Sequence, residues 1–150
     1  MTTSSKRIPS SARPELGDEL GFALYSTSLA MTKAYKPLLE PLGLTYPQYL
    51  AMLALWKDDD ITVKDISARL SLDPATITPL LKRLETLGYI SRRRGTEDER
   101  LVFIQLTPTG TALKQKASSV PAEIIRVMGQ STETLLQMKN GLETLRNKLS

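Results

Sequence analysis

The segment 62–106 constrains the fold of this chain more than any other part of the sequence. Asp73 and Pro74 form a strong helix start, because the carboxylate can accept hydrogen bonds from the first turn and proline has no amide to leave unpaired. Gly88 ends that helix at the position where a left-handed residue is favoured. A shorter helix precedes it, with Thr62 as its predicted N-cap. Two helices joined by a tight turn are therefore predicted, which is a helix-turn-helix.

The second helix of this motif has a core face and a free face. The apolar residues of this helix recur at helical spacing and are expected to be buried: Ile77, Leu80, Leu81, Leu84 and Leu87. The positions off the core carry short, polar or basic side chains: Ala75, Thr76, Thr78, Pro79, Lys82 and Arg83. Short side chains let a helix approach DNA closely, and Lys and Arg can contact guanine edges or phosphates. The free face is therefore the predicted major-groove surface.

Two extended segments follow Gly88. Residues 89–94 and 101–106 are rich in strand formers and enclose the polar loop 95–99. Such a hairpin forms a wing whose exposed arginines reach the DNA backbone or the minor groove. The predicted contacts on the wing are Arg92, Arg94, Asp98 and Arg100. Asp98 is expected to orient the guanidinium of Arg100 or Arg94, with a simple solvated turn as the alternative.

Positive charge gathers on these two elements. The chain has 20 Lys and Arg against 16 Asp and Glu, a formal net charge of +4. Five basic residues stand against one acid between positions 75 and 94, so this segment alone equals the surplus of the whole chain. A solvated helix face would look similar in isolation, but the placement on a recognition helix and its wing favours phosphate contact.

The composition excludes most catalytic chemistry. The 150 residues contain no Cys and no His, which removes disulfides, thiolates, imidazole bases and the usual transition-metal ligands. We expect no catalytic residues, no cofactor and no metal, and the protein is not expected to be an enzyme. The acidic run 58–60 could bind a hard cation, but a solvated turn is favoured. Without a bilayer-length apolar run or a signal-peptide core, a cytoplasmic protein without membrane contact is expected.

The rest of the chain is predicted to form long helices around this motif. Residues 1–15 should be a flexible arm, residues 16–40 a single long helix, and Tyr46 and Pro47 should open the next helix. The helical segment after Thr107 should kink or divide at Pro121. The last helix carries an apolar seam with spacings of three and four residues: Leu135, Met138, Leu142, Leu145 and Leu149. Burial within one subunit is the alternative, but pairing of two subunits is favoured.

These elements define one mainly helical domain over residues 16–150. The expected fold is a winged helix-turn-helix with a small β-hairpin wing and with N- and C-terminal dimerisation helices. The DNA-reading lobe should cover about 46–106, and the dimerisation helices about 16–40 and 107–149.

The sequence resembles the MarR family of bacterial transcriptional repressors from Leu16 to Leu149. The resemblance rests on the stretch LSLDPATITPLLKRLETLGYISR, on DER in the wing followed by LTPTG, and on the order of the helices. Within the family, the stretch GFALYSTSLAMTKAYKPLLEPLGLTYPQYLAMLALW is most similar to the organic-hydroperoxide-resistance repressors. The resemblance implies a dimer whose recognition helices enter successive major grooves of a pseudo-palindromic operator in double-stranded DNA.

One departure from that subgroup concerns its sensor. The resemblance places a peroxide-reactive cysteine at the position of Gly21, with its sulfur held by tyrosines that resemble Tyr35 and Tyr46. Because this chain has no Cys, oxidation of a thiol cannot occur in it. Either this relative senses something else, or the chain is an altered or insensitive form.

Aromatic residues around Gly21 and the second helix suggest an effector pocket. Its predicted lining is Gly21, Phe22, Tyr25, Tyr35, Tyr46 and Tyr49. Aromatics in helices are more often core, but a glycine inside the first helix leaves room, and phenolic hydroxyls suit a small aromatic acid or a phenolic ligand. The sequence therefore predicts a dimeric repressor, with effector release as a further hypothesis. The alternative is a small-molecule-binding protein of the same fold that has lost specific DNA binding.

Overall fold

The structure is a computed structural model that describes residues 14–150. Its helices are α1 (Leu20–Leu39), α2 (Tyr46–Lys57), α3 (Val63–Leu70), α4 (Pro74–Thr86), α5 (Pro108–Lys116), α6 (Val120–Met128) and α7 (Thr132–Leu149). Its strands are β1 (Ile61–Thr62), β2 (Ile90–Arg94) and β3 (Val102–Leu106), and its 3-10 turns are η1 (Leu16–Asp18), η2 (Glu40–Leu42) and η3 (Ala117–Ser119). No helix in this part of the chain is long and apolar enough to cross a membrane.

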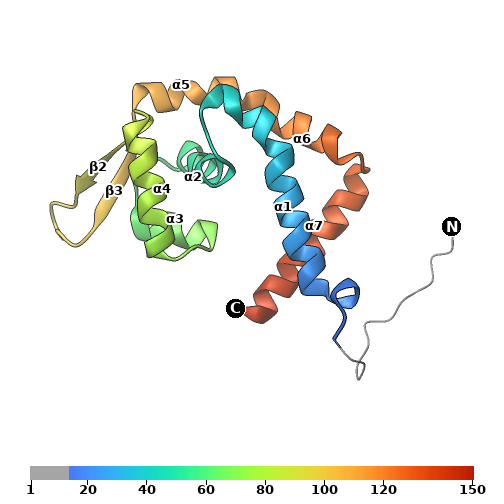
Figure 1. Cartoon of the computed structure of the whole chain (residues 1–150). Helices are drawn as coiled ribbons and strands as arrows, with labels where there is room; N and C mark the ends of the chain where they lie inside the picture. The colour runs from blue at the N-terminus through green and yellow to red at the C-terminus, as the bar shows by residue number, and fades with distance from the viewer. Residues whose placement is uncertain (1–13) are drawn as a thin grey trace.

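The helices and strands form two regions that α5 connects (Figure 1). One region is the reading lobe, in which α2, α3 and α4 pack together and the β2–β3 hairpin projects outward. The other region contains α1, α6 and α7, with α1 packed against α6. The expected fold class, mainly helical with a small β-hairpin wing, is confirmed.

Local capping explains the helix-turn-helix. The Thr62 side chain accepts from the amide of Asp65 at 3.0 Å and starts α3, and the Asp73 carboxylate accepts from the amide of Thr76 at 2.8 Å and starts α4. Each bond satisfies an amide that has no partner within its helix. Gly88 follows α4 with a φ of 82°, so the predicted starts and the predicted end are confirmed.

The sheet contains one strand more than the sequence predicted. β3 lies in the middle, with β2 antiparallel on one side and β1 on the other. Phe103 on β3 is in register with Thr62 of β1 and with Arg93 of β2. The two residues of β1 are too few for a hydrophobic period, and Thr62 also carries the N-cap signal of α3. β1 fixes the hairpin to the lobe.

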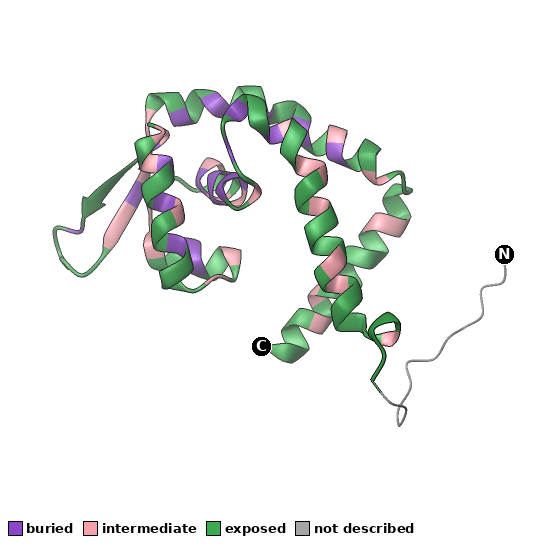
Figure 2. Ribbon diagram, in the orientation of Figure 1, coloured by how far each residue is buried: buried purple, intermediate pink, exposed green. Residues whose placement is uncertain are grey.

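The core lies in the reading lobe and at its junction with α5 and α6, as the buried segments in Figure 2 show. Met52, Leu55, Ile66, Ile77 and Leu84 are fully buried there. By contrast, α7 contains no buried residue and α1 buries only Leu39. These terminal helices expose many large apolar side chains: Leu20, Phe22, Tyr25, Leu29, Leu136, Met138, Leu142 and Leu149. The single chain therefore leaves two apolar helix faces uncovered.

The first predicted helix is shorter than expected. Instead of running from residue 16, α1 begins at Leu20, because Gly17 is a poor helix former and Glu19 has an extended backbone with a ψ of 119°. The predicted arm 1–15 lies outside the described residues except for Pro14 and Glu15, which have no regular structure. The predicted division near Pro121 is confirmed, since η3 separates α5 from α6.

A dense joint connects the hairpin to α5. The Trp56 indole donates to the carbonyl of Gly110 at 2.9 Å, and the amide of Thr107 donates to the carbonyl of Tyr89 at 3.1 Å. Gly110 is buried against that same Tyr89 carbonyl, so closely that a Cβ would overlap with it. Only glycine fits here without moving the strand.

Gly110→Ala should therefore destabilise the protein by about 1–3 kcal/mol, the usual cost of overpacking a tight site. Urea unfolding followed by circular dichroism measures this change. Thr111→Ala, at an exposed position of the same helix, is the matched control and should change stability by less than about 0.5 kcal/mol. Equal stability of the two variants would contradict the conclusion that only glycine fits at position 110.

Candidate nucleic-acid interface

The free face of α4 is exposed along its whole length. All six positions that the sequence assigned to it have exposed side chains: Ala75, Thr76, Thr78, Pro79, Lys82 and Arg83. The Thr78 hydroxyl donates to the carbonyl of Pro74 at 2.8 Å, so its oxygen can still accept a hydrogen bond from another partner. The helix thus presents small groups first and two cations further along.

The tip of the wing is held by backbone and carboxylate contacts. Arg94 donates from Nη1 to the carbonyl of Glu99 at 2.9 Å across the loop. Asp98 accepts from Nε and Nη2 of Arg100 at 3.0 and 3.1 Å and also from the Arg100 amide at 3.0 Å. These hydrogen bonds from Arg100 lower the pKa of the Asp98 carboxyl. Asp98 therefore orients Arg100, whereas the sequence had left open whether its partner would be Arg100 or Arg94.

The remaining arginines of β2 have carboxylate partners in the reading lobe. Arg92 lies 3.2 Å from Glu85 of α4, which connects the wing to the recognition helix. Arg93 pairs with Asp60, and its guanidinium carbon lies 4.4 Å from the centroid of the Phe103 ring. Two members of the predicted basic cluster are thus partly neutralised, which composition alone could not show.

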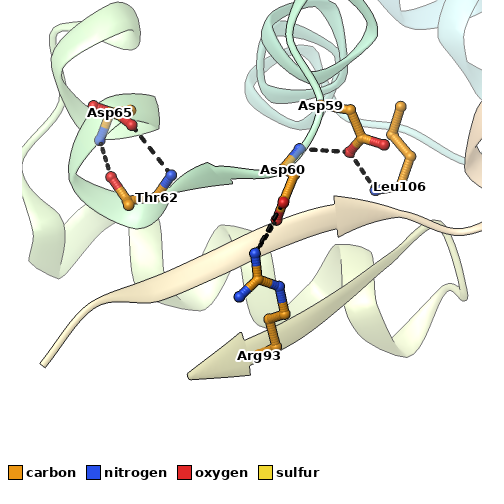
Figure 3. A network of polar contacts seen from close by, with 6 residues as sticks. All are labelled: Asp59, Asp60, Thr62, Asp65, Arg93 and Leu106. Carbon is orange, nitrogen blue, oxygen red and sulfur yellow. Dashed lines mark hydrogen bonds and ion pairs between the residues drawn. The ribbon is translucent and has the colours of Figure 1, made fainter. Parts of the chain in front are cut away.

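The carboxylates of the acidic run 58–60 have partners within the protein, and Figure 3 shows those of Asp59 and Asp60. Asp58 pairs with Arg69 at 2.8 Å, Asp59 accepts from the amide of Leu106 at 2.8 Å, and Asp60 pairs with Arg93. Between residues 14 and 150 no group of three or more His, Cys, Asp or Glu residues is placed to hold a metal ion. The sequence analysis considered a cation site and a solvated turn for this run, and neither interpretation included these contacts.

Three of the predicted pocket residues form an aromatic cluster at the start of α2. The Tyr35 ring centroid lies 4.4 Å from that of Tyr46 and 5.9 Å from that of Tyr49. Burial, followed by the neighbouring Tyr46 and Tyr49, raises the pKa of Tyr35 to about 12, and burial also raises the pKa of Tyr46 and of Tyr49. All three phenols are therefore neutral at physiological pH and can donate hydrogen bonds.

The other three predicted pocket residues lie elsewhere on α1. Gly21, Phe22 and Tyr25 precede Tyr35 by ten to fourteen residues, so they lie roughly 15–21 Å from it along the helix axis. Apart from its own helix, a Cβ built on Gly21 meets no atom of residues 14–150 within 4 Å. Within one chain the helix therefore separates Gly21 from the tyrosines, and the pocket around Gly21 stays a prediction.

A cavity of about 400 Å³ lies beside the cluster, between α1, the turn before α2, and α4. Its floor includes Leu39 and Leu44, and Tyr46 is the only predicted pocket residue on its wall. Charged side chains at its rim come from α1 and from the recognition helix: Lys33, Lys36, Glu40 and Arg83. The sequence reading missed the lysines, although their three-residue spacing places both on one face of α1.

An exposed recognition helix followed by an antiparallel hairpin defines a winged helix-turn-helix protein. The family model described as transcriptional regulator SarA/Rot matches residues 33–117. The chain is 50% identical over 131 residues to the organic hydroperoxide resistance transcriptional regulator of Bacillus subtilis, covering 87% of this chain and 89% of that one. It is 41% identical to the HTH-type transcriptional regulator TtmR of Methylorubrum extorquens, covering 89% and 69%.

A solved structure agrees with these relatives. Reduced AbfR bound to DNA, a protein of Staphylococcus epidermidis, superimposes with a TM-score of 0.77 at 30% identity, covering 90% of this chain and 95% of that one. The chain belongs to the MarR family of transcriptional regulators. It is a DNA-binding regulator and not an enzyme.

Proposed function

We propose that this regulator is a cytoplasmic repressor that binds a pseudo-palindromic operator as a homodimer. The exposed polar and basic face of α4 beside the arginine-bearing hairpin is the observation that carries the proposal. Each α4 enters a major groove, and the two half-sites lie about one helical turn apart. Similarity to a regulator solved in complex with DNA supports this mode of binding.

The contacts divide by chemistry. Thr76 and Thr78 approach base edges, while Lys82 and Arg83 contact guanine edges or phosphates. Arg94 and Arg100 extend from the wing to the backbone or the minor groove. The Arg100 side chain is 90% exposed, and Asp98 fixes its direction.

Arg94→Ala and Arg100→Ala should each weaken operator binding and lower the slope of log affinity against log salt by about one, because each removes one phosphate contact. The operator is a duplex selected from a random library by the wild-type protein, and fluorescence anisotropy measures affinity at several salt concentrations. Lys116→Ala, which removes an exposed charge at the far end of α5, is the control. Unchanged affinity and slope in both wing variants would refute the wing contacts.

Dimerisation accounts for the uncovered helices. Of the predicted three-and-four seam on α7, Met138 is 52% and Leu142 48% exposed and Leu149 is also exposed, while Leu135 and Leu145 are half-buried within the chain. The first turns of α1 add Leu20 and Phe22, which are also exposed. Apolar faces of this extent mark an interface, and a second copy offers the same two faces in return.

Leu142→Asp should abolish the dimer and operator binding together, because it places a charge in the apolar seam. Analytical ultracentrifugation and anisotropy measure the two losses. Asn140→Asp adds the same charge on the same helix but off the seam, and it should leave both intact. A folded Leu142→Asp monomer that still binds the full operator tightly would overturn this interface.

The cavity beside Tyr46 is the proposed effector site. Its apolar floor suits an aromatic ring, and Lys33, Lys36 and Arg83 at its rim suit a carboxylate. Arg83 also lies on the free face of α4. An acid that binds Arg83 therefore competes with DNA for the same guanidinium. This competition supports release of DNA by a small aromatic acid, and it favours this cavity over the pocket around Gly21 as the effector site.

4-Hydroxybenzoate should release the selected duplex, and Lys36→Ala should raise the concentration required by about tenfold while leaving ligand-free affinity unchanged. Titration of the DNA complex by anisotropy, with calorimetry of the free protein, measures both effects. Lys64→Ala, an exposed lysine of α3, is the control. If the acid binds but no duplex is ever selected, the alternative of a small-molecule-binding protein is correct.

A further inference from the structure

We propose that Arg93 and Asp60 act as positioning residues that hold the wing at the angle required for DNA, and that Arg93 is not itself a DNA contact. Together with Asp59 and Phe103 they form what we name the wing strut. The inference rests on the proposed function, since the wing matters only if it contacts DNA.

Two attractions fix the Arg93 guanidinium in the strut. Its Nη2 atom donates to both carboxylate oxygens of Asp60, at 3.0 and 2.9 Å (Figure 3). Its carbon lies 4.4 Å from the centroid of the Phe103 ring, a cation–π distance. A guanidinium held by a carboxylate and by an aromatic face has little freedom to reorient toward a phosphate.

The strut joins all three strands. Asp60 directly precedes β1, Arg93 is on β2, and Phe103 of the central β3 is in register with Arg93. Asp59 adds a second attachment: one carboxylate oxygen accepts from the amide of Asp60 and from that of Leu106, each at 2.8 Å. The turn 59–60 therefore holds the hairpin by both of its strands.

Alternation along β2 places Arg93 on the face away from α4. Successive side chains of a strand point to opposite faces. Arg92 reaches Glu85 of α4, so Arg92 and Arg94 share the face toward the recognition helix, and Arg93 points to the other face, where it meets Asp60. A duplex that lies along α4 meets the first face.

The position of the strut gives it leverage over the wing tip. The loop 95–99 begins only a few residues beyond Arg93, so the tip lies roughly 10 Å further out at the rise of a strand. A rotation at the strut consequently shifts the loop and Arg100 directly after it, which can break a hydrogen bond to a phosphate.

Asp60→Asn distinguishes a positioning role of the Asp60–Arg93 pair from a purely electrostatic one, because the two roles predict opposite changes in affinity for DNA. Simple electrostatics predicts tighter binding, because the variant removes a negative charge and frees Arg93 for phosphate. The strut predicts weaker binding, by about twofold to fivefold, the range expected for a half-exposed ion pair. Asp60 has a φ of 56°, a conformation that Asn tolerates, so the substitution adds no backbone strain. Asp58→Asn, which breaks the nearby pair with Arg69, is the matched control.

Arg93→Gln completes a double-mutant cycle. The strut predicts that Arg93→Gln weakens binding of the selected duplex without changing the salt slope, and that the double variant binds no more weakly than Arg93→Gln alone. Loss of a phosphate contact would instead lower the slope by about one, as for Arg94→Ala. Asp60→Asn binding as tightly as wild type or tighter, or a lower slope for Arg93→Gln, would overturn the proposal.

Hydrogen exchange tests the strut without DNA. Amides of segment 90–106 should exchange faster in Asp60→Asn and Arg93→Gln than in wild type and in Asp58→Asn, because the hairpin is less firmly attached. If wild type selects no duplex, the proposed function fails, while faster exchange still supports the strut. Unchanged exchange in both variants would overturn it whatever the DNA result.

Discussion

Burial of one face of α4 determines where the candidate DNA contacts of the recognition helix lie. Ile77 and Leu84 are completely buried and Leu81 is 1% exposed, each worth about 1.5–3 kcal/mol of hydrophobic burial. Rotating the helix to hide its other face would bury Lys82 and Arg83 without partners, which is far costlier. The Asp73 cap at one end and left-handed Gly88 at the other fix its length. The recognition face is therefore preformed before any duplex arrives.

Local signals made this part predictable from the sequence, and non-local contacts made the rest unpredictable. The caps Asp73 and Thr107 depend on residues three positions away, so a short window contains the whole interaction. The pair of Asp60 with Arg93 joins residues 33 positions apart and requires both the left-handed Asp60 and the central place of β3. No periodicity records such a contact, and the acidic run therefore looked like a simple turn.

The pocket prediction shows a different limit of pattern reading. Gly21 and Tyr35 lie on the same helix, but they are fourteen residues apart along its axis. Only the tyrosines of a second copy could therefore lie beside Gly21. The resemblance supplied a set of positions without saying which chain contributes each. With no Cys in the sequence, the tyrosines have no thiolate to hold. Their neutral phenols, beside the cavity lined by Tyr46, suit a ligand that accepts hydrogen bonds.

The arginines around the wing are alike in charge but not in role. Arg92 and Arg93 neutralise Glu85 and Asp60 within the lobe, so the electrostatic footprint is smaller than the raw count of the segment. Arg94 and Arg100 are also anchored, to a carbonyl and to Asp98, yet Arg100 remains largely exposed. Anchoring removes rotamer freedom before binding, so less side-chain entropy is lost when a phosphate is contacted. For the proposed contacts of Arg94 and Arg100, the internal bonds of the wing therefore favour DNA binding, because they order these side chains in advance.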